Sequence, residues 1–134
     1  MDMEPGFERI SVPFTLSELY QGLAEGDGIL RIEPDALVLE FQVRDAIFGV
    51  LKTEIKELRI RFEDIDTVEM RKRWWSRSLR LRTHSLRVAA AIPGMKGGDV
   101  VIRIKRRDLL AARLAVSRLA LLMSEARLRR IEGW

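Results

Sequence analysis

Apolar residues occupy every second position along much of this chain, which is the period of a β-strand that buries one face. The pattern is clearest after the turn at residues 33–36, where Leu39 and Phe41 fall on one face and Glu40 falls on the other. An apolar stretch before this turn predicts a β-hairpin. The same alternation predicts about seven strands in all, near residues 7–14, 29–32, 37–43, 58–62, 67–71, 79–90 and 100–104.

Two segments between the strands have a different character. Thr15 to Glu18 have the form of a capping box, in which side chains at a helix start satisfy free amide groups. We therefore expect a short helix through residue 23, ended by Gly26 and Gly28. Residues 44–56 show no clear period, and a packed loop and a bent strand both remain open for them.

From about Asp108 the apolar spacing changes to three and four residues, which predicts one long amphipathic C-terminal helix. We expect its inner stripe to contain Leu109, Ala112, Val116, Leu119, Ala120 and Met123, with Arg106, Arg113, Ser117 and Ser124 facing away. The apolar face is wider than this stripe. It is therefore covered either by the sheet or by a second molecule, and the candidate contacts with another copy are Leu110, Leu114, Leu121 and Leu128.

The composition is that of one globular domain, with 134 residues, 47% of them hydrophobic and 33% charged. The absence of cysteine excludes disulfides and thiolate chemistry, and the single His84 cannot build a histidine metal site alone. We expect no cofactor and no metal. The first residues lack the basic and apolar segments of an export signal, and no apolar run has the length of a membrane span, so a cytoplasmic location is expected.

The charge is divided unevenly along the chain. Residues 1–70 carry 16 acidic and 7 basic side chains, whereas residues 71–113 carry 2 acidic and 13 basic ones. Such a division favours an anionic partner or self-association through opposite faces, although internal pairing would also account for it.

The basic half contains the segment most suggestive of function, in which Trp74 and Trp75 lie among cations. These residues could bind an anionic membrane surface, with tryptophans at the headgroup boundary and arginines on phosphates. They could instead stack on unpaired bases, or form a solvated face in which one tryptophan fills the end of the sheet. Nucleic acid is not the expected partner. The candidate residues for an anionic partner are Arg71, Lys72, Arg73, Trp74, Trp75, Arg77, Arg80 and Arg82.

No pattern in the chain predicts catalysis. Residues 94–99 contain glycines and a lysine without the spacing of a phosphate-binding loop, and they precede a strand rather than a helix. Asp64 and Asp66 lack the glycine and glutamate that a calcium loop requires. The serines near His84 do not lie in a nucleophile elbow. We expect no catalytic residue and no enzyme.

The order of about seven antiparallel strands followed by one amphipathic helix resembles the pleckstrin-homology-like (PH-like) superfamily, in particular its bacterial members. The resemblance covers residues 26–125 and rests on the hairpin at 28–43, the strand, break and strand at 58–68, and the closing helix. It implies a seven-stranded barrel or sandwich, mainly β in class, capped by the helix. Members bind phosphoinositides, peptides or one another, but the acidic turn at residues 33–35 does not match the basic hairpin of the lipid-binding branch.

The sequence therefore predicts one domain over residues 1–134, with an N-terminal strand and helix extension at 1–25, a PH-like core at 26–126 and a tail at 127–134. The leading hypothesis for its function is a non-enzymatic module for protein interaction or self-assembly. The alternative is a peripheral binder of anionic membranes. A small-ligand pocket near residues 47–51 is a further hypothesis.

Overall fold

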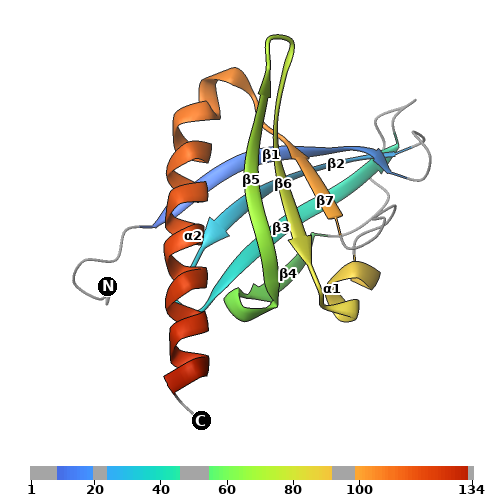
Figure 1. The fold of residues 1–134 in the computed structure, drawn as a ribbon. Coiled ribbons are helices and arrows are strands. Elements are labelled where there is room, and N and C mark those ends of the chain that lie inside the picture. Colours follow the sequence, from blue (N-terminus) through green and yellow to red (C-terminus); the bar gives the residue numbers. More distant parts are fainter. Residues whose placement is uncertain (1–8, 20–23, 46–54, 92–98, 133–134) are drawn as a thin grey trace.

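The computed structural model describes residues 9–19, 24–45, 55–91 and 99–132 (Figure 1). The pocket expected near residues 47–51 and most of the turn expected at residues 94–99 lie outside these ranges. The described residues form seven strands, two α-helices and two short 3-10 turns. In chain order these are β1 (Ile10–Leu19), β2 (Ala24–Ile32), β3 (Ala36–Asp45), β4 (Lys56–Arg61), η1 (Phe62–Asp64), β5 (Ile65–Arg73), β6 (Ser76–Thr83), α1 (Leu86–Ala91), β7 (Asp99–Arg103), η2 (Arg106–Asp108) and α2 (Leu109–Glu132).

All seven strands belong to one antiparallel sheet, in the order β4-β3-β2-β1-β7-β6-β5. Thr15 pairs with Arg103, so β1 connects the two halves of the sheet. Figure 1 shows β5 and β6 crossing in front of β2 and β3. The mainly β architecture with one C-terminal helix is therefore confirmed. Within the described residues the end strands β4 and β5 do not pair with each other, so the sheet is open.

A single apolar cluster fills the space between the two halves of the sheet and the inner side of α2. The helix packs against β1, η1 and β5. Leu119 is fully buried at the middle of the helix, and alanines at positions 112, 115 and 126 are buried on the same side. Their small side chains let the helix backbone approach the sheet closely. Because α2 is fixed by this inner side, its outer side is held in a defined direction.

The helix expected over residues 15–23 is wrong for its described part, because Thr15–Leu19 continue β1. Val12, Phe14 and Leu16 are all buried, so the period of two continues into the apparent capping box. Pairing with β2 and β7 outweighs the local helix signal. β1 is also a central strand, between β2 and β7.

Gly28 lies inside β2 instead of ending a helix. A Cβ atom at this position would lie 2.8 Å from a ring carbon of Phe14 and 2.8 Å from the Cβ of Phe41. It would also overlap the carbonyl oxygen of Glu40. Glycine is required here by close packing between neighbouring strands.

The strand expected to run through residues 79–90 ends at Thr83, and Leu86–Ala91 form the short helix α1 instead. Ser85 precedes this helix, and its hydroxyl accepts a 3.4 Å hydrogen bond from the amide of Val88. The hydroxyl of Thr83 accepts another from the amide of Ser85, at 3.1 Å. These side-chain contacts favour a helix start over a strand.

The long C-terminal helix is confirmed, although it continues to Glu132 and includes most of the expected tail. Ala112, Leu119 and Met123 are buried as expected. Ala120 is exposed, whereas Ala115 and Ala126 are buried in its place. The inner stripe is therefore centred on Leu119.

Candidate functional site

The outer surface of β5, β6 and β7 gathers most of the cations expected to bind an anionic partner. Successive side chains of a strand point to opposite faces, and the cross-strand partners Arg71 and Ser78, and Arg80 and Val101, lie on one face. We call this surface the Trp–Arg face. It consists of Arg71, Arg73, Trp75, Ser76, Ser78, Arg80 and Val101.

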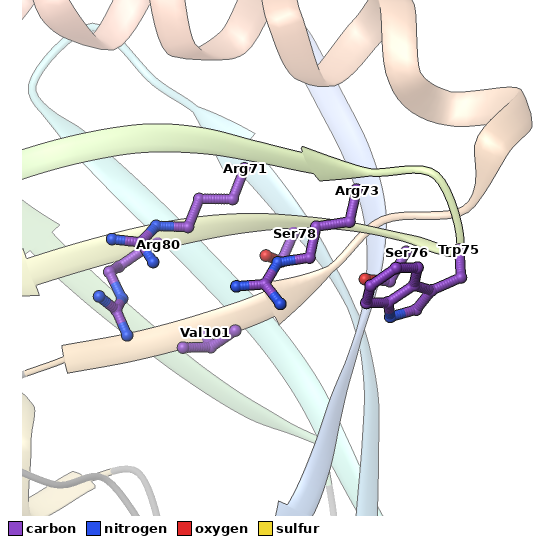
Figure 2. A pocket seen from close by; sticks show the side chains of 7 residues that line it. All are labelled: Arg71, Arg73, Trp75, Ser76, Ser78, Arg80 and Val101. Atoms are coloured by element: carbon purple, nitrogen blue, oxygen red, sulfur yellow. The ribbon is translucent and has the colours of Figure 1, made fainter.

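The Trp–Arg face contains a shallow pocket of about 200 Å³. Figure 2 shows the side chains that line it, with Arg71, Arg73 and Arg80 directed to the same side of the sheet as Trp75. Three guanidinium groups thus border one depression together with two serine hydroxyls. Such a set offers several hydrogen-bond donors to an anion with more than one oxygen.

The arginines of this face differ in how far they are already paired. Arg71 donates two hydrogen bonds to Glu69, at 3.1 and 3.2 Å. The guanidinium carbon of Arg73 lies 5.9 Å from the ring centre of Trp75, within reach of a cation–π interaction. The Nε of Arg80 is buried and has no hydrogen-bond partner among the described residues. Neither Arg73 nor Arg80 donates a side-chain hydrogen bond to another described residue, so their terminal guanidinium nitrogens remain for a ligand, whereas the Nε of Arg80 is too buried to reach one.

Arg82 belongs to the same strand but is engaged by Asp99. Its Nε and a terminal nitrogen donate to the two carboxylate oxygens at 2.7 and 3.1 Å. Hydrogen bonding to Arg82 lowers the pKa of Asp99, and the same contact raises the pKa of Arg82. The pair keeps both charges at neutral pH and occupies Arg82.

Two tryptophans form the tip of the β5–β6 hairpin. Trp74 is 87% exposed and Trp75 is 65% exposed, and their rings meet edge to face at 5.7 Å. Figure 1 shows this hairpin extending past the sheet, at the end of the molecule where α2 begins. Neither ring fills the end of the sheet, so the interpretation of one as a core plug is wrong.

Sequence reasoning placed Lys72 and Arg77 in the same group, but they pair with each other across the hairpin at a position between those of the Trp–Arg face. Alternation directs their side chains to the opposite face of the strands. Ser76, Ser78 and Val101 were missed. Val101 is more than twenty residues from the hairpin tip in sequence and joins the face only through the pairing of β6 with β7.

Internal pairing with the acidic first half does not account for this basic face. The acidic residues of β2–β4 are paired with arginines of their own half, since Arg31 contacts Glu33, Glu40 and Glu57. Arg59 lies 2.9 Å from Glu33 and from Asp35. Among the described residues, the contacts between acidic side chains of the first half and cationic or histidine side chains of the second are those of Arg71 with Glu69 and of His84 with Asp64 and Asp66.

A second surface is the outer side of α2. Five large apolar side chains on this helix are more than half exposed, and they lie opposite the buried stripe centred on Leu119. We call this surface the leucine face. It consists of Leu110, Leu114, Leu121, Leu128 and Ile131, and so includes all four residues expected to contact another copy.

Titratable groups gather at one further place in the described residues. The Nδ1 of His84 lies 2.6 Å from Asp66, and its Nε2 lies 3.8 Å from Asp64. Arg127 of α2 donates to the carbonyl oxygen of Asp66 at 3.0 Å. These contacts connect β5, the segment after β6, and α2. No group of three acidic, histidine or cysteine residues in the described ranges has the geometry to hold a metal ion.

Neither α-helix in the described part of the chain combines the length and the apolar character needed to cross a membrane. Comparisons with protein-family models, with curated proteins and with solved structures gave no match to this chain.

Proposed function

We propose that this protein is a non-enzymatic module that self-assembles through the leucine face of α2. The observation that carries the proposal is the row of large apolar side chains, each more than half exposed, on a helix whose opposite side is packed in the core. Contiguous apolar surface of this kind marks interaction sites in soluble proteins. A second copy of the chain is the occupant that fits it best, for reasons of spacing and area.

The spacing is that of a coiled-coil seam. Leu114, Leu121 and Leu128 are seven residues apart, and Leu110 and Ile131 fall at the intermediate positions of the same heptads. Two parallel copies in register would place each leucine against its own equivalent. Ser117 and Ser124 would then also meet their equivalents, and an antiparallel pair would instead place leucines against these serines. In the parallel pair, therefore, leucines contact leucines and serines contact serines.

The exposed area is also sufficient. The five side chains expose on the order of 500 Å² per copy, so a symmetric pair would bury roughly 1,000 Å² of apolar surface, at the lower bound for a specific interface. The sheets would lie on opposite sides of the helix pair, since the leucine face and the buried stripe are on opposite sides of α2.

The PH-like assignment forms part of this proposal. Seven antiparallel strands closed by one C-terminal helix support it, and so does the way α2 covers the space between β1 and β5, two strands that are not neighbours in the sheet. In this proposal the open sheet is strongly bent into a sandwich-like body. Modules of this kind take their biological role from the partners they assemble with.

Sedimentation equilibrium over a concentration series tests the proposal. We expect a reversible dimer in the micromolar range, with unchanged secondary structure on dilution. A monomer at all concentrations up to the high micromolar range would overturn it, and so would a dimer that survives replacement of Leu114 and Leu121 by serine.

A further inference from the structure

The Trp–Arg face arranges its groups by depth behind the hairpin tip. Trp74 and Trp75 form the turn itself, whereas Arg73 and Arg71 lie one and three residues before Trp74. Because a β-strand rises about 3.3 Å per residue, Arg73 is about 3 Å and Arg71 about 10 Å behind the tip. The headgroup region on each side of a bilayer is about 5–8 Å thick. Trp74, Trp75 and Arg73 therefore match successive layers of a membrane interface when the hairpin stands upright. Arg71, and Arg80 at about 17 Å behind the tip, reach the lipid phosphates when the hairpin tilts toward the Trp–Arg face.

The rings have the chemistry of interface anchors. Tryptophan combines a large apolar surface with a polar N–H group and concentrates at the boundary between water and lipid. The edge-to-face contact between Trp74 and Trp75 joins them into one apolar wedge at the end of a narrow hairpin. Such a wedge can enter a bilayer without any movement of the sheet.

The cations behind the wedge suit phosphodiester groups. The terminal guanidinium nitrogens of Arg73 and Arg80 have no partner among the described residues, and the hydroxyls of Ser76 and Ser78 lie in the same pocket. Arg71 already donates a hydrogen bond to Glu69. Arginine binds phosphate oxygens in pairs, and juxtamembrane cations add affinity for anionic lipids.

We propose that the β5–β6 hairpin attaches the protein to anionic membranes, with Trp74 and Trp75 inserted at the interface and Arg71, Arg73 and Arg80 bound to lipid phosphates. This surface is separate from the leucine face, so a single copy can bind a membrane without self-assembly, and pairing would add only avidity. A single-stranded nucleic acid fits the geometry less well, because the two indole planes are 88° apart and successive bases of one strand cannot stack on both in parallel.

Vesicle sedimentation is the test, using phosphatidylcholine vesicles with and without phosphatidylglycerol. We expect binding to the vesicles that contain phosphatidylglycerol and little binding to the others. Replacing Arg71, Arg73 or Arg80 by glutamine should weaken binding about fivefold each, and about a hundredfold together. Replacing Trp74 and Trp75 by alanine should weaken it by at least about tenfold. Equal binding to both types of vesicle would overturn the proposal.

A matched control is Arg129→Gln, which removes the same charge from the exposed last turn of α2, at the end of the helix away from the hairpin tip (Figure 1). It should leave vesicle binding unchanged. Glu69→Gln tests the opposite direction, because it releases Arg71 from its partner. It should strengthen binding severalfold, and a loss of affinity would contradict the assignment.

Tryptophan fluorescence locates the contact. In a Trp134→Phe background, emission comes only from Trp74 and Trp75 and should shift to shorter wavelength with anionic vesicles. Inorganic phosphate at matched ionic strength should not displace the protein from them. Displacement by phosphate would show that the site binds free anions and would overturn the membrane proposal. Tight binding of a single-stranded oligonucleotide, without binding to vesicles, would overturn it as well.

Discussion

Two leucines on α2 allow the roles of its two faces to be separated by the same substitution. Leu119 is fully buried and Leu121 is 54% exposed, although they are two residues apart. The exposed part of Leu121 is roughly 90 Å², and truncation to alanine removes about 60 Å² of it. A symmetric dimer contains this side chain twice, so at about 25 cal/mol per Å² the loss is about 3 kcal/mol. The dissociation constant of the dimer should rise about a hundredfold.

Sedimentation equilibrium measures this change, and urea denaturation at concentrations where the protein is monomeric measures stability. Leu121→Ala should leave monomer stability almost unchanged, because alanine is a good helix former and the site is solvated. Leu119→Ala should lower the free energy of unfolding by about 2–5 kcal/mol through the cavity it leaves. Leu86→Ala, at an 86% exposed leucine on α1, is the control for self-association and should have no effect. Equal dimer strength in Leu121→Ala and Leu86→Ala would contradict the assignment of the leucine face to the dimer interface.

Three other predictions follow from the same geometry. Gly28→Ala should lower the free energy of unfolding by about 1–3 kcal/mol, because its Cβ would overlap the backbone of Glu40. Ser11→Ala, at an exposed position of β1, is the control, and equal stability of the two variants in urea would contradict the close packing at Gly28. Added salt should weaken vesicle binding, because it screens the attraction between arginines and lipid phosphates. It should strengthen the dimer, because α2 carries more arginines than glutamates and two parallel copies repel each other. Sedimentation at low and high salt measures both effects, and a dimer that dissociates in salt would contradict the parallel pairing. Parallel pairing also places both hairpin tips at the same end of the dimer. Leu121→Ala, which weakens the dimer, should therefore weaken vesicle binding severalfold through lost avidity. Unchanged vesicle binding would exclude attachment through two tips.

The parts of the fold that could be predicted from sequence are those decided by near neighbours. The hairpin around residues 33–36 was correct because its turn and both alternating strands are contiguous, and the amide of Glu33 donates to the carbonyl of Ala36 at 2.9 Å. The strand at Thr15 was not predicted, because its partners include Arg103, which is distant in sequence. The start of α1 could have been found from Ser85, whose hydroxyl is a typical helix cap.

The candidate surfaces show the same limit. Composition identified Trp74, Trp75 and the arginines around them, and helical spacing identified the exposed leucines. The period of two could also have separated Lys72 and Arg77 from the Trp–Arg face. The contributions of Val101 and of the Arg82–Asp99 pair could not be found this way, because they depend on the register between β6 and β7.

Cysteine cross-linking tests the central claim of self-assembly through the leucine face most directly, because the chain has no cysteine of its own. Ser117 and Ser124 lie on the exposed side of α2 between the leucines and would each face their equivalents across a parallel pair. Single variants Ser117→Cys and Ser124→Cys should each form a disulfide-linked dimer rapidly under mild oxidation, and Ser11→Cys on β1 should not. Cross-linking of Ser11→Cys at the same rate, or no cross-linking of either α2 variant, would contradict the account.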